Sequence, residues 1–247
     1  MRLTVLGGCG AWPEAGQACS GFLLEQDGFR LLADLGYATV PRLLELVTAD
    51  QVDAVFISHR HPDHCADLSA LLRARTLRED PAPPLPVYTL PGAVDAVLAL
   101  DRPGMLAGAV ALHEFRAGAT LDIGPFHAAT RLLPHSVPNA GLRLTGGGRV
   151  LVYTGDSGPG PEIVDLARSA DLLLAEASFI DRVPADTRRY LSSARQAGQQ
   201  AAQAGAGHLV LTHLLPGTDH PAARAAAGAH FDGDISVATG GQVCSLP

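Results

Sequence analysis

The stretch His59-Arg60-His61-Pro62-Asp63-His64 decides how this chain is interpreted. It follows the apolar residues 53–58, a pattern that indicates a buried strand of the parallel-sheet type. A helical pattern begins just after it, near Ala66. Three imidazoles and one carboxylate therefore lie in a loop at the end of a strand, and such loops commonly carry the chemistry of a protein.

The spacing of these groups suits metal binding. Residues i and i+2 of an extended chain point to the same side, so His59 and His61 can aim at one metal ion. Pro62 favours an extended conformation at His61, which helps to hold that geometry. The chain then turns, and Asp63 and His64 can face a second ion. The alternative is a surface loop of solvated histidines, which the density of ligands after a buried strand disfavours.

Composition sets the class of protein. The chain has 247 residues, of which 47% are hydrophobic and 17% charged, so it can bury a sizeable core and long disorder is not expected. We find no linker or break in composition, which predicts a single domain over residues 1–247. The net charge of −7 argues against extended binding of nucleic acid through bulk electrostatics.

The compartment is predicted from cysteines and from the start of the chain. The four cysteines, none in a Cys-x-x-Cys pair, are expected to be buried thiols in a reducing cytosol, although Cys65 could support the neighbouring His64. The start of the chain lacks the longer apolar segment of a signal peptide, and no run approaches transmembrane length. These features predict a cytoplasmic protein that does not bind membranes.

The remaining pattern alternates strands and helices, and helices must cover the faces of a sheet, so a layered α/β sandwich is expected. Asp27-Gly28 between two apolar runs predicts a hairpin. Helices are expected at 41–47, from about 66 to before 81, and at 92–100, 161–169, 192–204 and 221–229. Strands are expected at 3–6, 21–25, 29–34, 53–58, 87–90, 110–115, 120–123, 126–133, 142–144, 150–153, 171–175, 208–212, 235–237 and 242–244.

Three further ligand candidates follow predicted strands: His135, Asp156 and His213. Each repeats the arrangement of the opening stretch, in which a strand ends and presents a ligand. If these strand ends lie on one edge, seven groups converge on it. Imidazole and carboxylate ligands suit zinc, and manganese or iron could also fit.

With these residues in place, the chain resembles the metallo-β-lactamase superfamily, and within it the ribonuclease Z-like phosphodiesterases. The resemblance rests on three motifs, His59 to His64, Thr154-Gly155-Asp156-Ser157-Gly158 and Leu211-Thr212-His213. Other segments resemble that branch at residues 6–13, Ser20, residues 135–141 and residues 175–179, so the resemblance spans nearly the whole chain.

The resemblance implies a four-layer αββα sandwich with two divalent metal ions, expected to be zinc, at one edge. It assigns His59, His61 and His135 to one ion. It assigns Asp63, His64 and His213 to the other, with Asp156 as a bridge.

Two departures from ribonuclease Z argue against the processing of tRNA 3′ ends. Those enzymes carry a long tRNA-gripping arm between the ligands matched by His135 and Asp156, where this chain has only about twenty residues. They also carry a histidine before the Glu-Ala segment, where this chain has Ala175. The substrate expected here is therefore a small anionic molecule.

The predicted activity is metal-dependent hydrolysis, most simply of a small phosphodiester. Two ions about 3.5–4 Å apart would lower the pKa of a shared water toward about 7, giving a hydroxide nucleophile that Asp63 orients or deprotonates. Glu176 and Ser157 are candidates for protonating the leaving group, or else make structural hydrogen bonds, and His220 could line the pocket.

Other functions stay open at this point. A lactone, thioester or other carboxylic ester is the alternative substrate in the same fold, and a metal-binding protein without catalysis is a further alternative. A diiron oxygen-reducing protein is disfavoured, because that branch has a glutamate where His61 stands. A homodimer is an analogy with related proteins only.

Overall fold

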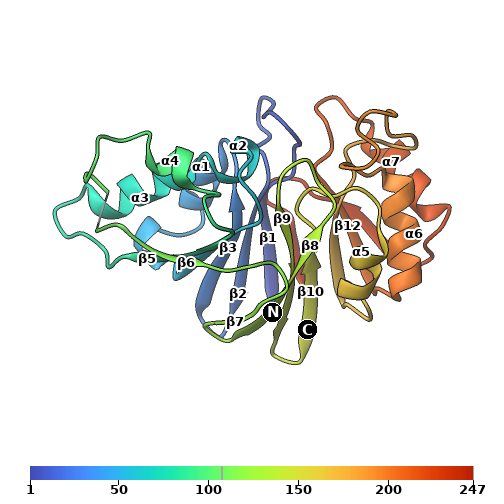
Figure 1. Ribbon diagram of the computed structural model, residues 1–247. Helices are drawn as coiled ribbons and strands as arrows, with labels where there is room; N and C mark the ends of the chain where they lie inside the picture. The colour runs from blue at the N-terminus through green and yellow to red at the C-terminus, as the bar shows by residue number, and fades with distance from the viewer. Residues whose placement is uncertain (107, 247) are drawn as a thin grey trace.

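The computed structural model describes residues 1–106 and 108–246. Its two seven-stranded sheets face each other (Figure 1). The first sheet contains, in spatial order, β14 (Val243–Ser245), β1 (Arg2–Gly7), β2 (Gly21–Gln26), β3 (Phe29–Leu35), β4 (Ala54–Ile57), β5 (Leu85–Thr89) and β6 (Val110–Glu114). The second contains β13 (Asp234–Val237), β12 (His208–Thr212), β11 (Leu172–Glu176), β10 (Arg149–Tyr153), β9 (Asn139–Gly146), β8 (Phe126–Leu133) and β7 (Thr120–Ile123).

Helices cover the outer faces of both sheets. The first sheet carries α1 (Thr39–Leu44), a 3₁₀ turn (Ala49–Gln51), α2 (Pro62–Cys65), α3 (Leu68–Thr76) and α4 (Asp95–Leu98). The second sheet carries α5 (Pro161–Leu166), α6 (Ala194–Ala204) and α7 (His220–Gly228). The predicted α/β class and four-layer αββα sandwich are confirmed, with helices outside and sheets inside (Figure 1).

Three apolar clusters hold the layers together. The central one joins the two sheets and includes Phe22, Phe56, Phe126 and Tyr153, all nearly inaccessible to water. The other two lie between each sheet and its own helices. Because every central strand is covered on both faces, β4, β11 and β12 are apolar runs rather than alternating patterns.

Strand direction brings the candidate ligands to one end. β3, β4, β5 and β6 run parallel, as do β10, β11, β12 and β13. The carboxyl ends of β10 and β12 lie at the upper end in Figure 1, and the two chain termini lie at the lower end. At that lower end Met1 pairs with Leu246, so the chain closes away from the candidate ligands.

The strands match the predictions closely, whereas several helix limits differ. The helix expected from about 66 is preceded by α2, because Pro62 supplies the fixed φ of a first helical position. The helix expected at 92–100 is reduced to α4, since Gly92 has a φ of 73° and its amide donates to Glu114. The helix expected at 161–169 ends at Leu166, and Ser169 has a left-handed φ of 51°.

No helix within residues 1–106 and 108–246 combines the length and apolar character needed to cross a membrane.

Candidate metal centre

The seven predicted ligands lie on the segments that follow four strands. His59 follows β4, and α2 then turns Asp63 and His64 back toward it. His135 follows β8, Asp156 follows β10 and His213 follows β12. The first sheet thus contributes four of the predicted ligands and the second sheet contributes three. The structure brings all seven together.

The first cluster consists of His59, His61, His135 and Asp156, whose ligand atoms all lie within 4.8 Å of one another. Nδ1 of His61 lies 3.1 Å from Nε2 of His59 and 3.1 Å from Nε2 of His135. Three imidazole nitrogens and a carboxylate converging in this way form a donor set that a divalent ion such as zinc accepts.

The second cluster consists of Asp63, His64, His213 and Asp156, again with ligand atoms within 4.8 Å of one another. Nε2 of His213 lies 3.1 Å from Asp63 Oδ2 and 3.2 Å from Asp156 Oδ2, and Nε2 of His64 lies 3.0 Å from Asp156 Oδ1. Asp156 belongs to both clusters. The division of the seven groups is therefore the one that the sequence predicts, and Asp156 stands where a bridging ligand is needed.

Two buried atoms indicate that this donor set fits a metal ion. His64 Nε2 and Asp156 Oδ1 are inaccessible to water and have no hydrogen-bond partner among the described residues, although they lie 3.0 Å apart. Leaving buried polar atoms unpaired costs about 1–3 kcal/mol each. A cation between the ligands would satisfy both atoms at once.

The imidazoles are also oriented as metal ligands usually are. Four of them hold their outer nitrogen against a partner: His59 Nδ1 lies 3.0 Å from Ser58 Oγ, His64 Nδ1 2.7 Å from Asp34 Oδ2, His135 Nδ1 2.9 Å from the Tyr190 carbonyl, and His213 Nδ1 2.9 Å from Ser178 Oγ. Such outer contacts fix the ring and leave Nε2 to face the ion.

Asp34 is the residue that the sequence analysis missed. Its buried carboxylate accepts hydrogen bonds from the Ser58 amide and hydroxyl and from the Tyr153 hydroxyl, each at 2.7 Å, besides its contact with His64. It therefore ties β3, β4 and β10 to one metal ligand. The signal in the sequence was an aspartate inside an apolar strand, where an unpaired charge is costly.

Charge balance within the clusters shifts the pKa of several ligands in opposite directions. Burial lowers the pKa of His59, and burial also lowers that of His135, so both are neutral and ready to bind a metal. Burial also opposes the charged form of His64 and His213, but nearby carboxylates, above all Asp156, outweigh it and raise the pKa of each. Metal binding at the second cluster should therefore release protons.

The backbone around the second cluster leaves no spare room. The amide of Ala11 donates to Asp63 Oδ2 at 2.9 Å. A Cβ at Gly10 would lie 2.6 Å from Nδ1 of His213, and one at Gly36 would lie 1.9 Å from the Asp63 carbonyl oxygen. Close approach to a candidate ligand thus explains Gly10 in the loop after β1 and Gly36 after β3.

The three residues proposed beside the metal ligands have distinct surroundings. Both carboxylate oxygens of Glu176 accept hydrogen bonds, from the Ser157 amide, the Ser178 hydroxyl and the Ser192 amide, and burial raises its pKa to about 7. The Ser157 hydroxyl donates to the Gly158 carbonyl at 2.9 Å. His220 lies at the start of α7 and lines a pocket of about 190 Å³ that includes Leu214, the residue after His213, but none of the seven candidate ligands.

Glu176 therefore positions the site from behind His213, through the hydroxyl of Ser178. Cys65 has a similar supporting place: its thiol lies 3.3 Å from the His61 carbonyl and contacts no ligand side chain among the described residues. Burial raises the pKa of that thiol to about 12. The four other histidines, His113, His127, His208 and His230, lie outside both clusters.

Comparisons with known proteins agree with this geometry. Residues 19–214 match the model of the family described as the β-lactamase superfamily domain. The probable metallo-hydrolase YhfI of Bacillus subtilis is 31% identical over 98% of this chain and 99% of its own length, and its crystal structure superposes with a TM-score of 0.90.

Ribonuclease Z proteins are also similar. That of Kineococcus radiotolerans is 29% identical over 86% of this chain and 83% of its own length. The crystal structure of the short form of human tRNase Z covers 100% of both chains with a TM-score of 0.80 at 24% identity, a likeness of fold.

Proposed function

This chain belongs to the β-lactamase superfamily and is a metallo-hydrolase of that fold, and we propose that it hydrolyses a small phosphodiester. One observation carries the proposal: two ligand clusters share Asp156 and contain two buried ligand atoms without protein partners. Paired sites of this kind suit the displacement reactions of phosphoesters.

The seven ligands would hold the ions, as assigned above. Bound there, two divalent ions supply an acidified water and positive charge against the developing anion. Asp63 would orient the attacking water, while the amide of Ala11 holds Oδ2 of that carboxylate in place. Burial opposes ionisation of Asp63, but the hydrogen bond from His213 and the positive charge of His64 outweigh burial, so the pKa of Asp63 lies well below its usual range.

The surroundings of Glu176 and Ser157 favour a positioning role for both. The two oxygens of Glu176 are engaged by donors, and the Ser157 hydroxyl is engaged by a carbonyl, so neither offers a free proton to a leaving group. We therefore expect the fastest substrates to be esters with acidic leaving groups, which depart without help from a protein acid.

Two features support a phosphodiester of modest size. Relatives named ribonuclease Z, whose name describes action on RNA, are 28–29% identical to this chain over most of its length. Between His135 and Asp156 the chain forms only a short loop and the hairpin of β9 and β10. That hairpin pairs within the second sheet, so it offers no arm for gripping a folded RNA.

Metal analysis followed by a substrate panel tests this function. The protein, loaded in turn with zinc and manganese, would be assayed against bis(p-nitrophenyl) phosphate, p-nitrophenyl phosphate, a lactone, a thioester and a β-lactam. We expect the diester to be hydrolysed fastest and chelation to abolish that activity. Turnover of lactones or thioesters alone would overturn the phosphodiester proposal, and a protein that neither binds nor responds to metal would overturn the hydrolase mechanism.

A further inference from the structure

Among the described residues, the exposed aromatic side chains lie on three segments whose backbones approach the candidate metal centre. The chain has one Trp, four Tyr and seven Phe. Only Trp12, Tyr37 and Tyr190 are exposed, to 54%, 39% and 39%. Each of the three lies on a segment whose backbone contacts a metal ligand, as the next paragraphs describe for each residue. Large exposed aromatic groups gathered beside a reactive centre indicate a binding surface rather than ordinary surface composition.

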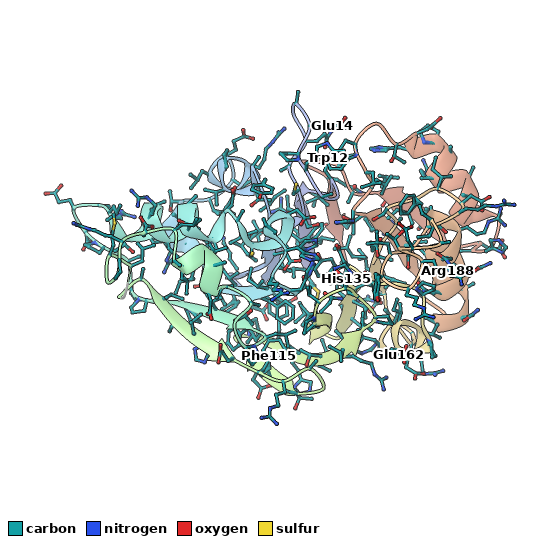
Figure 2. The ribbon with its side chains drawn as sticks, turned by 45° about the horizontal axis from the view of Figure 1, so that its top comes forward. Trp12, Glu14, Phe115, His135, Glu162 and Arg188 are labelled. Atoms are coloured by element: carbon teal, nitrogen blue, oxygen red, sulfur yellow. The ribbon has the colours of Figure 1, made fainter. Side chains whose placement is uncertain are left out.

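Trp12 is anchored to the second cluster. It directly follows Ala11, whose amide donates to Asp63, and its own amide donates to the Gly10 carbonyl at 2.8 Å. Gly10 in turn packs against the ring of His213 and donates to the Leu214 carbonyl at 3.0 Å. Figure 2 shows Trp12 on a projecting loop that also carries Glu14. The exposed indole is thus held on a short, fixed piece of backbone.

Tyr190 is anchored to the first cluster, and Tyr37 to the segment beneath Asp63. The carbonyl of Tyr190 accepts a hydrogen bond from Nδ1 of His135 at 2.9 Å. The carbonyl of Tyr37 accepts a hydrogen bond from the Cys19 amide at 2.9 Å. Tyr37 directly follows Gly36, whose backbone lies against the carbonyl of Asp63. We call these three residues the aromatic rim. Its members are attached to both clusters and therefore flank the ligand set.

Charge is distributed unevenly along the same segments. Arg182, Arg188 and Arg189, close to Tyr190 in the chain, are exposed and form no ion pair with a described residue. The acidic residue Glu14, in contrast, lies beside Trp12 on the loop after β1 (Figure 2). Residues 182–189 hold three arginines and one aspartate, Asp186, which leaves a local excess of positive charge in a protein with a net charge of −7. A phosphate group is favoured near the arginines, and an uncharged flat group is favoured near Trp12.

We propose that Trp12, with the other members of the aromatic rim, binds a planar aromatic group carried by the ester substrate, and that a nucleobase is that group. Stacking on a tryptophan suits every nucleobase because each has a π-face, and the arginines complement the phosphate that accompanies it. The inference rests on the proposed hydrolysis of phosphoesters and assigns Trp12 as the residue that selects among them.

Fluorescence tests the inference directly, because Trp12 is the sole tryptophan of the chain. Metal-loaded and metal-free protein would be titrated with AMP, ribose 5-phosphate and phenyl phosphate, with emission followed at constant protein concentration. We expect AMP to change the emission of Trp12 saturably and ribose 5-phosphate to change it far less. A response to phenyl phosphate as strong as that to AMP would refute the assignment of a nucleobase as the bound group. The site would then bind aromatic groups in general.

Variants separate stacking from other effects. By calorimetry, Trp12→Leu should weaken AMP binding about tenfold and leave ribose 5-phosphate unchanged, whereas Trp12→Phe should retain most of the affinity for AMP. Leu77→Ala is the matched control, because Leu77 is 51% exposed at the end of α3, away from both clusters. Trp12→Leu that binds AMP like the wild type would overturn the inference.

The binding test and the turnover test can fail independently, so their outcomes distinguish this inference from the proposed function. Equal affinity for AMP and ribose 5-phosphate, together with hydrolysis of bis(p-nitrophenyl) phosphate, would overturn the aromatic rim and leave the proposed function standing. Stacking of AMP on Trp12 without hydrolysis of any phosphodiester would overturn the function and leave the rim. Emission of Trp12 that depends on protein concentration without ligand would show a second copy covering it, which also overturns the inference.

Discussion

The carboxylate of Asp34 makes four hydrogen-bonding contacts that support the candidate metal centre. It fixes the ring of His64, holds both the amide and the hydroxyl of Ser58, and accepts from Tyr153 across the sheets. Ser58 in turn holds His59, so Asp34 supports one ligand of each cluster. Its φ of 57° is strained for a residue other than glycine, which is typical of positions that function requires.

Asp34→Asn should therefore weaken metal binding. An amide keeps the size of the carboxylate but cannot accept from all four donors, and changes of this kind cost roughly 10–100-fold in metal affinity. Competition with a chromophoric zinc chelator measures the loss. Tyr153→Phe removes one of the four bonds and leaves His64 in place, so its loss should be much smaller. Equal affinities for wild type and Asp34→Asn would contradict the supporting role.

Asp63→Ala should remove turnover and leave the fold largely intact. The side chain is both a ligand of the second cluster and the group that orients the attacking water, so we expect a loss of at least about 10²-fold in kcat. Asp232→Ala, at an exposed aspartate near the end of the second sheet, is the control. Circular dichroism checks the fold, and wild-type rates in Asp63→Ala would refute the assignment.

For single residues, the sequence identifies candidate metal ligands more readily than the residues that hold those ligands in position. The convergence of the seven candidate ligands was predictable because His59 to His64 is dense in donors and because His135, Asp156 and His213 each follow an apolar strand. The roles of Asp34 and Ser178 were not, since an aspartate inside a strand indicates that a polar partner is needed but does not identify it, and a single serine carries no signal. Their role depends on contacts with residues 30 and 35 positions away, which spacing does not reveal.

Among the elements, the loop after β1 has the least freedom. It passes between Asp63 and His213 and carries Trp12, and it can do so only because Gly10 has no side chain. The sequence alone could not show that the neighbour of Gly10 would be a ligand ring, because His213 comes from the far half of the chain.

Gly10→Ala should displace this loop. The added Cβ would lie 2.6 Å from both Nδ1 and the carbonyl oxygen of His213, so the loop or the ligand must move. We expect activity to fall by more than about tenfold, since misplacement of a ligand by about 1 Å can cost 10²-fold. Gly16→Ala, in the same loop with open space around it, is the control, although its φ of 78° adds strain. Similar activity in both variants would contradict the steric explanation.

Strands were more predictable than helices for a related reason. A buried strand such as β4 or β12 is a short apolar run between turn residues, and both sheets contain several. The limits of α4 and α5 depend instead on Gly92 and Ser169, whose left-handed backbone follows from tertiary contacts. The amide of Ser169, for example, donates to the Ala204 carbonyl at the end of α6.

At the scale of the whole molecule, the candidate metal centre joins the two sheets. His59, His61, Asp63 and His64 come from the first sheet, and His135, Asp156 and His213 come from the second. Bound ions would therefore hold together two layers that are otherwise joined by apolar packing and by a few bonds such as Tyr153 to Asp34.

Removal of metal should lower the thermal stability reversibly. A site filled at 100-fold excess over its Kd adds about 2.7 kcal/mol to the free energy of unfolding. For a chain of this size each kcal/mol corresponds to roughly 2–4 °C, so chelation should lower the Tm by roughly 5–10 °C for each such site. Scanning calorimetry with and without EDTA, followed by readdition of zinc, measures the change, and an unchanged Tm would contradict metal binding at this centre.

The distribution of ligands also sets when this protein can become active during synthesis. Four ligands lie between residues 59 and 64, but their partner His213, which lies 150 residues after Asp63, leaves the ribosome near the end of translation. At about 5–20 residues per second, the nascent chain spends on the order of ten seconds with half of a metal centre. A nascent chain that has not yet reached His213 lacks part of the donor set, so the second cluster cannot be complete before that residue is added.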